Sequence, residues 1–564
     1  MKPSDTTLAR TGGQLLIDAL KVHGVDLVFG VPGESYLAAL DAFHDASEKI
    51  QFVICRQEGG AAYMAETYGK LTGRPGICFA TRGPGATNAS LGVHTAYQDS
   101  SPMILFIGQV GTDFIEREAF QEIDYRRMYG QMAKWVAQID RADRVPEYVH
   151  RAFHTAVSGR PGPVVLALPE DMLRETATVA DTGRYRRVAA HPGEADLQKL
   201  RGMLAQAKRP FVLLGGSDWN AQACADFRAF TEANNLPVGT AFRRQDLYDN
   251  RLPNFVGDVG IGINPKLAER VKTCDLLIAV GARMDEITTC GYTLIEAPRP
   301  KPRFVHVHPG AEVLGKVYEG ELLINSGMPE FAQAARKLVP VDSSAWKDWT
   351  KTARSDYEAW LAPEPAPGNL HPGEVIAYLR KRLPPETIIT NGAGNFAGWI
   401  HRYYPYPGFR TELAPTSGSM GYGVPSGVAA KLVHPDRPVV SFSGDGDFLM
   451  CGQELATAAQ YDLKIVFIVV NNGMYGTIRM HQERDYPGRV SGTELKNPDF
   501  AALARAYGLH GETVDKTADF EAAFERAWIA KTASLIEMRI DPDAITTRTT
   551  LSAIRANALK NRKA

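Results

Sequence analysis

A glycine-flanked aspartate and a pair of asparagines are the residues of this sequence best suited to chemistry. Gly444-Asp445-Gly446 follows an apolar run that is typical of a strand, and Asn471-Asn472 ends a second such run about 27 residues later. If the two runs are neighbouring parallel strands, Asp445 and Asn472 lie at their carboxyl ends, where open α/β sheets bind ligands. One carboxylate oxygen and one amide oxygen suit Mg²⁺, and the glycines with a helix N-terminus suit a diphosphate. The spacing therefore predicts a magnesium–diphosphate site.

Glu58 is a second candidate for chemistry. It stands in RQEGGAAYMAE after the apolar residues 52–55, where a strand is expected to end and a helix to begin. A carboxylate in that place can exchange a proton with a bound group. An ordinary glutamate at a helix N-terminus, favoured by the helix dipole, would look the same. The string alone does not decide between the two.

Other loops carry polar or glycine-rich strings that could line the same pocket. Two of these strings, TRGPGATN at 81–88 and NGAGN at 391–395, each follow an expected strand. Each could form an ordinary tight turn or a wall of a cofactor pocket. AFQE at 119–122 and Lys134 could reach a carboxylate substrate or lie on a solvated surface. SGSMGYGVP at 417–425 holds a methionine between glycines, either as a core residue or pressed on a bound cofactor.

Composition argues against several function classes. The chain has 564 residues, 44% of them hydrophobic, and a formal net charge of −1. Without a long block of one sign, that charge argues against nucleic acid or a membrane surface as a partner. No apolar run reaches the ~20 residues that span a bilayer, and the first residues lack the apolar core of a signal peptide. Six scattered cysteines without a CxxC pair fit buried thiols in a reducing compartment, so we expect a cytoplasmic protein.

The elements that must position these residues fall into three blocks. Each block alternates apolar, strand-like runs with amphipathic helical stretches, which is typical of a doubly wound parallel sheet. We place the blocks at residues 8–177, 194–341 and 371–542, with a basic, polar tail at 543–564. A proline-rich connector at 362–368 separates the second block from the third. The expected fold class is therefore α/β, with three doubly wound parallel-sheet domains.

In this order the strings resemble the acetolactate (acetohydroxyacid) synthase branch of the thiamine diphosphate (ThDP) enzymes, over almost the full length. The matching strings are RQEGGA, RPGICFATRGPGATN, SPMILFIGQV, AFQE, GSMGYGVP and GDGDF followed by NN. The resemblance implies an N-terminal pyrimidine-binding domain, a central domain and a C-terminal diphosphate-binding domain, with ThDP and Mg²⁺ as cofactors. It also implies active sites between subunits, hence a homodimer or homotetramer that acts on small 2-oxo acids. The sequence leaves open whether a small regulatory subunit exists.

The resemblance also assigns roles around the substrate. Glu58 matches the catalytic glutamate that acts on the pyrimidine ring of the cofactor. Gln121 and Lys134 match polar residues of the catalytic pocket, and Phe120 matches an apolar one. His481 aligns with a residue that borders the pocket for the acceptor substrate.

A further set of residues matches the cofactor and metal contacts of the family. Asp445 and Asn472 match the Mg²⁺ ligands, with the backbone carbonyl of Met474 as a third, and Met420 matches the apolar residue that holds ThDP bent. The cofactor contacts implied are Pro32, Gly33, Glu58, Asn88, Asn395, Ser419, Met420, Gly444, Gly446, Asp447, Met474 and Tyr475.

The sequence departs from the family pattern near the active site. Gly59 stands where the family often has glutamine after the catalytic glutamate, and Asn395-Phe396 replaces a Gln-His pair. His481 replaces a tryptophan that favours 2-oxobutyrate as acceptor in the biosynthetic enzymes. We therefore expect pyruvate to be accepted at least as well as 2-oxobutyrate.

Departures in the central block concern FAD, which the biosynthetic members of the family also bind. Arg283, in GARMDE, matches one residue of the flavin site in those enzymes and is the one possible flavin contact that we assign. Residues 257–260 read GDVG in place of GMHG, and His308 replaces an aspartate on the ribose side. FAD is therefore a doubtful cofactor for this chain.

The leading function is a transferase of the acetolactate synthase type. Pyruvate would lose CO₂, and its remaining two-carbon unit would join a second 2-oxo acid, as in branched-chain amino acid biosynthesis. A simple 2-oxo acid decarboxylase is the alternative, but residues 113–134 lack the histidine pair of such enzymes and Ile478 stands in place of their acid. An oxidase would need tightly held FAD. A non-catalytic scaffold is disfavoured because Glu58, Asp445 and Asn472 are all present.

Overall fold

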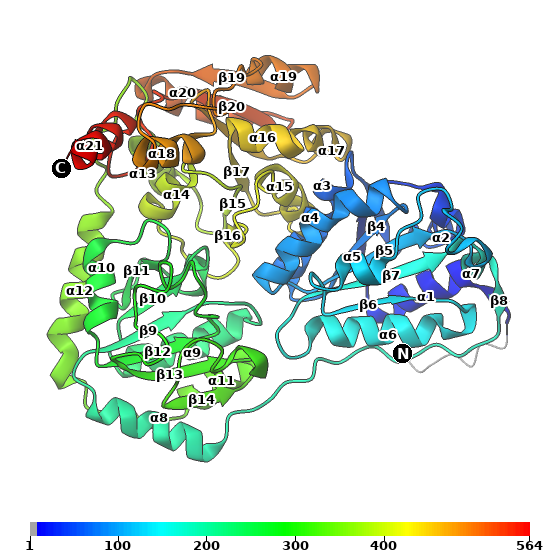
Figure 1. The fold of residues 1–564 in the computed structure, drawn as a ribbon, viewed down its shortest axis with the longest axis horizontal. Coiled ribbons are helices and arrows are strands. Elements are labelled where there is room, and N and C mark those ends of the chain that lie inside the picture. Colours follow the sequence, from blue (N-terminus) through cyan, green and yellow to red (C-terminus); the bar gives the residue numbers. More distant parts are fainter. Residues whose placement is uncertain (1–7, 564) are drawn as a thin grey trace. The chain divides into compact units, whose positions relative to one another are not determined.

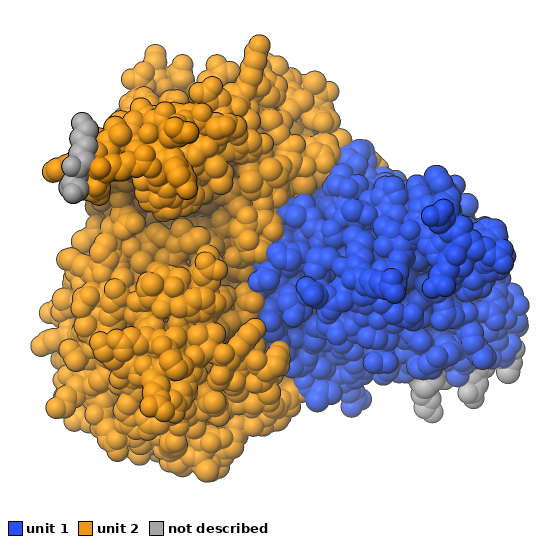
Figure 2. Space-filling view, in the orientation of Figure 1, with its two compact units in different colours: residues 1–188, 428–433 blue, residues 189–427, 434–564 orange. Residues whose placement is uncertain are grey.

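The computed structural model describes residues 8–563, which form three six-stranded parallel sheets and one two-stranded antiparallel sheet (Figure 1). Helices alternate with the strands, so the predicted α/β class with three doubly wound sheets is confirmed. The chain separates into two compact units, which Figure 2 colours separately. Unit 1 comprises residues 1–188 and 428–433, and unit 2 comprises residues 189–427 and 434–564. The central and C-terminal sheets thus share one unit, and the exact domain boundaries stay predictions.

Unit 1 contains the first large sheet. Its strands are β2 (Leu27–Gly30), β3 (Gln51–Ile54), β4 (Gly76–Ala80), β5 (Met103–Gln109), β6 (Trp135–Gln138) and β7 (Pro163–Pro169), beside the short pair β1 (Arg10–Thr11) and β8 (Thr176–Ala177). The order in the sheet is β3-β2-β4-β5-β7-β6. Every position of β4, β5 and β7 is buried, as expected for a parallel sheet covered by helices on both faces.

Helices cover both faces of this sheet. They are α1 (Gly12–His23), α2 (Leu37–Asp45), α3 (Glu58–Thr72), α4 (Pro84–Asp99), α5 (Tyr125–Tyr129), α6 (Val145–Val157) and α7 (Glu170–Arg174). α3 packs against α4, whereas α1 packs against α2 and α6. Local signals set the helix ends: Thr11 forms a capping box with Gln14 at the start of α1, and Gly24 ends that helix at φ 77°.

The central sheet lies in unit 2. Its strands are β9 (Pro210–Leu214), β10 (Val238–Ala241), β11 (Phe255–Val259), β12 (Leu276–Val280), β13 (Arg303–His308) and β14 (Leu322–Asn325). Its helices are α8 (Glu194–Gln206), α9 (Ala221–Ala233), α10 (Pro265–Thr273), α11 (Met328–Arg336) and α12 (Lys347–Trp360). The order β11-β10-β9-β12-β13-β14 reverses between β9 and β12, which makes a switch point at that edge.

The C-terminal sheet carries the GDG turn and the paired asparagines. Its strands are β15 (Ile388–Asn391), β16 (Glu412–Leu413), β17 (Val439–Gly444), β18 (Val466–Asn471), β19 (His510–Val514) and β20 (Ser534–Arg539). Its helices are α13 (Pro372–Arg382), α14 (Ala397–Tyr403), α15 (Gly423–Val433), α16 (Asp445–Cys451), α17 (Leu455–Gln460), α18 (Gly476–Asp485), α19 (Phe500–Ala506) and α20 (Thr517–Ile529). The order is β16-β15-β17-β18-β20-β19, so β17 and β18 are neighbours, as the sequence predicted.

The segment interpreted as a basic, polar tail is partly helical. It contains helix α21 (Leu551–Lys563), which packs on α18. Arg555 in α21 forms an ion pair with Glu483 in α18, and the glutamate side chain is completely buried. Leu551 and Ile545 join a small apolar cluster with Met474. Among residues 8–563, no helix combines the length and the apolar character needed to cross a membrane.

Candidate active site

Asp445 and Asn472 follow directly on two neighbouring parallel strands. β17 pairs with β18 so that Gly444 lies opposite Val470, and both strands therefore end at the same edge of the sheet. Asp445 is the first residue of α16, and its Oδ1 accepts the backbone N–H of Gly446 at 3.0 Å. The edge therefore presents a carboxylate and an amide side by side at a helix N-terminus.

The surroundings of Asp445 fit a bound divalent cation. Its Oδ2 accepts the backbone N–H of Gly473 at 2.8 Å and the side-chain amide of Asn497 at 2.7 Å. Burial raises the pKa of this carboxyl because the charge is removed from water, while the hydrogen bonds from its neutral donors oppose the shift. Within the described part of the chain, no lysine or arginine forms an ion pair with Asp445. A cation at this edge would supply the missing positive charge.

The two asparagines that close β18 have different surroundings. The Nδ2 of Asn471 donates to Glu537 Oε1 at 2.7 Å, and its Oδ1 accepts from Asn497 at 2.9 Å. The Oδ1 of Asn472 accepts a longer bond of 3.3 Å from the Met474 N–H. Asn471 therefore braces the edge, while Asn472 is better placed to give its oxygen to a metal. Residues 8–563 hold no cluster of three His, Cys, Asp or Glu suited to a metal. A metal at this edge would take carboxylate, amide and carbonyl oxygens, which are ligands that Mg²⁺ accepts.

Aromatic rings explain both glycines of the GDG turn. A Cβ on Gly444 would lie 2.8 Å from Cδ1 of Phe396. A Cβ on Gly446 would lie 2.5 Å from Cε1 of Tyr475. Both distances are too short for real contacts, so only glycine lets these rings pack against the turn. The sequence also predicts that these glycines let a diphosphate approach the backbone. The packing of the two rings does not test that prediction.

Asp447 joins two loops that carry predicted cofactor contacts. Its Oδ1 accepts the backbone N–H of Ala393 at 2.9 Å and that of Gly421 at 2.8 Å. A Cβ on Gly392 would lie 2.1 Å from Oδ2, so a glycine is needed where the carboxylate meets the first loop. Burial raises the pKa of Asp447 to about 6, while the two N–H donors oppose this shift. The loops around Asn395 and Met420 are thus held by one carboxylate.

Arg243 bonds the same two loops from the central sheet. It follows β10, adopts φ 58° and is buried. Its Nη1 donates to the carbonyl of Pro415 at 2.5 Å, and its Nη2 donates to the carbonyl of Gly392 at 3.1 Å. Asp447 therefore binds N–H groups of the two loops, and Arg243 binds carbonyl groups of the same loops.

The remaining cofactor candidates of unit 2 lie on these loops. Met420 is half-buried between Gly418 at φ 68° and Gly421 at φ 81°, two left-handed positions that favour glycine. The hydroxyls of Ser417 and Ser419 lie 2.9 Å apart. Asn395 is tied to α18, because its Oδ1 accepts the Thr477 hydroxyl at 3.0 Å and its backbone N–H donates to the same hydroxyl at 3.0 Å.

In unit 1, Glu58 is the first residue of α3 and is half-buried. Its Oε2 accepts the Asn88 side-chain amide at 3.0 Å. A Cβ on Gly85 would lie 3.0 Å from Oε1, so glycine leaves space beside the other carboxylate oxygen. The structure therefore brings two predicted residues, Glu58 and Asn88, into contact and orients the carboxylate through one of its oxygens.

Two glycines near Glu58 also have structural reasons. Gln57 caps α3 by accepting the Gly60 N–H at 3.0 Å, and a Cβ on Gly59 would lie 2.7 Å from the same Gln57 oxygen. The departure at position 59 is therefore tied to this cap. A Cβ on Gly33 would lie 2.5 Å from Cβ of Thr81, while Pro32 beside it is exposed.

The predicted substrate residues lie on a loop after β5. Phe120 has 70% of its surface exposed, and Gln121 adopts a left-handed φ of 65°. A Cβ on Gly83 would lie 2.7 Å from Cβ of Gln121, so the loop packs closely on the turn after β4. Lys134 has a different place, because its ammonium donates to the carbonyls of Thr155 and Ser158 at the end of α6. A cation there complements the helix dipole, and its catalytic role stays a prediction.

His481 lies on α18 and is half-buried. Burial lowers the pKa of its imidazole, so the ring is neutral near pH 7. Ile478, on the same helix, has 54% of its surface exposed. Its apolar side chain stands at the position predicted to hold an acid in simple 2-oxo acid decarboxylases. Because α18 also packs on α21, the C-terminal helix supports the element that carries His481.

The switch point of the central sheet is closely packed. At the switch point between β9 and β12, a Cβ on Gly216 would lie 2.0 Å from the carbonyl oxygen of Gly281, so the two turns touch. The Trp219 indole Nε1 and the Met328 sulfur lie 3.2 and 3.1 Å from the Cβ position of Gly281 and fill the adjoining space. His308 offers an imidazole, whose Nδ1 accepts the N–H of its own turn, where a carboxylate would bind the ribose.

Side chains to which the sequence assigned no role support the site. Asn497 bonds both Asp445 and Asn471, and Arg243 bonds two loops of another sheet. Arg82 belongs to the string at 81–88, predicted to be a tight turn or a wall of the pocket; it is buried and donates to the backbone carbonyl of Phe120. No local pattern predicts these contacts, because the partners are distant in the sequence.

Family models match most of the chain. The N-terminal TPP binding domain of thiamine pyrophosphate enzymes matches residues 10–128, their central domain matches residues 197–335, and their C-terminal TPP binding domain matches residues 392–538. Each matched stretch contains one of the three large sheets or most of it.

Curated proteins are similar over nearly the whole length. The acetolactate synthase isozyme 2 large subunit of Escherichia coli (strain K12) is 30% identical over 534 residues, which are 94% of this chain and 95% of that protein. The acetolactate synthase large subunit of Parasynechococcus marenigrum (strain WH8102) is 32% identical, over 94% of this chain and 87% of its own length. That of Lactococcus lactis subsp. lactis (strain IL1403) is also 32% identical, over 90% and 88%.

Proposed function

The chain belongs to the thiamine pyrophosphate (thiamine diphosphate) enzyme family, and from that premise we propose that it is an acetolactate synthase-like transferase. It decarboxylates pyruvate and joins the remaining two-carbon unit to a second 2-oxo acid. When bound, ThDP supplies the carbon nucleophile and electron sink for both steps. The observation that carries the proposal is the placement of Asp445 and Asn472 at the ends of adjacent strands, in a chain whose relatives carry the acetolactate synthase name.

The residues around β17 and β18 hold the cofactor's diphosphate through Mg²⁺. Asp445, Asn472 and the Met474 carbonyl are the proposed ligands, a set of hard oxygens that Mg²⁺ prefers. Asn497 and the Gly473 N–H keep the Asp445 carboxylate in place. The N-terminus of α16 adds a favourable dipole for a negatively charged group at the same edge.

Glu58 is the proposed proton carrier. Asn88 holds Oε2, so Oε1 beside Gly85 is the atom that gives or takes a proton at the pyrimidine ring. Phe120, Gln121 and His481 are proposed to contact the 2-oxo acids, and Lys134 keeps its proposed role as a polar pocket residue. Exposed Ile478 supports carboligation over simple decarboxylation, because protonation of the two-carbon unit needs an acid.

Product analysis tests the proposal. The protein is incubated with pyruvate, ThDP and Mg²⁺, and CO₂, acetolactate and acetaldehyde are measured. We expect one CO₂ per acetolactate, since two pyruvates yield one molecule of each. Acetaldehyde as the main product would favour the decarboxylase, and no turnover of any 2-oxo acid would favour a binding scaffold. Omission of ThDP, and the variant E58Q, serve as controls.

We further propose activity without FAD in a homodimer or homotetramer. The contacts between Gly216, Gly281, Trp219 and Met328 support the first part. Flavin absorbance near one equivalent per chain, with activity lost on stripping, would overturn it. Light scattering of the purified protein decides the assembly, and a single-chain mass would contradict the second part.

A further inference from the structure

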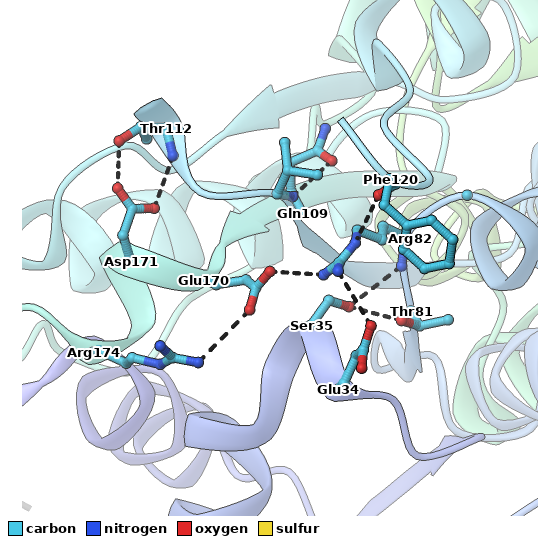
Figure 3. Close-up of polar contacts among 12 residues, drawn as sticks. Glu34, Ser35, Thr81, Arg82, Gln109, Thr112, Phe120, Glu170, Asp171 and Arg174 are labelled. Carbon is cyan, nitrogen blue, oxygen red and sulfur yellow. Dashed lines mark hydrogen bonds and ion pairs between the residues drawn. The ribbon is translucent and has the colours of Figure 1, made fainter. Parts of the chain in front are cut away.

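An ion cluster centred on the buried Arg82 side chain holds the loop that carries Phe120 (Figure 3). The Arg82 side chain is only 9% exposed. Its Nε donates to the Phe120 carbonyl at 3.1 Å, its Nη1 to Glu170 Oε1 at 2.8 Å, and its Nη2 to Glu34 Oε1 at 3.2 Å. One guanidinium thus joins three other segments of unit 1.

The segments joined by this cluster follow four adjacent strands. Glu34 begins the short helix η1 (Glu34–Tyr36) after β2, Arg82 follows β4, the loop follows β5, and Glu170 begins α7 after β7. These strands are consecutive in the sheet, in the order β2-β4-β5-β7. The cluster therefore runs along the carboxyl edge of the sheet, where α/β proteins place their ligand-binding loops.

The loop needs such an anchor because its own conformation is costly. Glu116, Glu118 and Gln121 have φ values of 62°, 51° and 65°, which residues other than glycine rarely adopt. The Phe120 side chain is 70% exposed and gives the loop little packing within unit 1. The peptide that links Phe120 to Gln121 is held instead by the guanidinium and by the close approach to Gly83.

The charge of Arg82 is already compensated by Glu34 and Glu170, so this residue offers no open cation to a substrate carboxylate. We propose that Arg82 is a positioning residue for the reaction. It fixes the Phe120–Gln121 peptide and thereby the two side chains that meet the 2-oxo acid. The roles of Phe120 and Gln121 rest on the proposed function, whereas the anchoring of the loop is measurable without turnover.

The first test measures the loop directly. Trypsin cleaves after Arg117, an exposed residue of the loop. If the loop opens and closes faster than trypsin cuts it, the cleavage rate follows the fraction of molecules in which the loop is open. In the full chain loaded with ThDP and Mg²⁺, we expect R82Q to raise this rate about tenfold or more, a factor that corresponds to about 1.4 kcal/mol. The matched control is R174Q, because Arg174 lies 3.7 Å from the other oxygen of Glu170 and leaves the Arg82 contacts intact. Its cleavage rate should stay within twofold of wild type.

The second test separates positioning from general stability. R82Q should lower kcat/KM for pyruvate about tenfold or more and raise KM, while ThDP affinity and the melting temperature change little. R82K keeps the charge but cannot reach three acceptors, so it should fall between wild type and R82Q, and it replaces R82Q if that variant fails to fold. An unchanged cleavage rate in the folded variant overturns the inference. Faster cleavage sustains the anchoring of the loop by Arg82 even if the wild type turns over no 2-oxo acid, a result that would overturn the proposed function and with it the role in the reaction.

Discussion

Replacement of Asp447 by alanine is the sharpest test of how the cofactor loops are held. The carboxylate is buried and accepts the N–H groups of Ala393 and Gly421, at 2.9 and 2.8 Å. A hydrogen bond to a charged group contributes about 1.5–3 kcal/mol, so the two bonds together contribute about 3–6 kcal/mol. D447A also leaves both N–H groups buried without an acceptor. If half of this loss appears in cofactor binding, the Kd for ThDP at saturating Mg²⁺ rises roughly 10- to 100-fold.

Calorimetric titration with ThDP and urea unfolding measure the two parts of this loss. D447N keeps an oxygen acceptor without the charge and should lose less than about tenfold in affinity. The matched control is D275A, because Asp275 also accepts two backbone N–H groups, of Lys208 at 2.7 Å and Arg209 at 2.9 Å, before the start of β12. It should lower stability and leave the ThDP Kd unchanged. Wild-type affinity in D447A, or an equal loss in D275A, would refute the reasoning.

Four further results are expected. E58Q should lower kcat roughly 10²- to 10⁴-fold with ThDP still bound, and normal hydrogen–deuterium exchange at the cofactor's C2 in this variant would contradict the role of Glu58. N472A should weaken ThDP binding and its Mg²⁺ dependence while the fold survives, as circular dichroism would show; equal affinity removes the metal assignment. E483Q should cost about 2–3 kcal/mol in urea unfolding. Because the Arg555 guanidinium lowers the pKa of Glu483 to about 2, that contribution is present above the ordinary glutamate pKa and is lost as pH falls from about 4.5 toward 2. H481W should shift competition toward 2-oxobutyrate over pyruvate, since a pocket methylene is worth roughly 1–3 kcal/mol, and an unchanged product ratio would place His481 outside the acceptor pocket.

Local pattern determined the fold class and the edge on which the site lies. Apolar runs that end in glycine or polar residues predict strands and turns, because the pattern of buried and exposed side chains in these elements is set within a few consecutive residues. Parallel strands then bring their carboxyl ends to one edge without further information. For this reason the sequence placed Asp445 after one strand and Asn472 after its neighbour, and it placed Glu58 at the start of a helix. It did not predict helix α21 within the polar tail, since the ion pair between Glu483 and Arg555 joins residues 72 positions apart.

Only the tertiary structure decided which side chains hold these elements in place. Arg243 reaches the carbonyl of Pro415 across 172 positions, and Asn497 reaches Asp445 across 52. Arg82 meets Glu170 across 88 positions, and its role depends on the order of four strands in a sheet. Such contacts carry no periodicity in the sequence, because each depends on where two distant segments meet. The sequence by itself thus determined the edge of the sheet and predicted the reacting groups, whereas folding selected the polar and charged side chains that hold the surrounding loops.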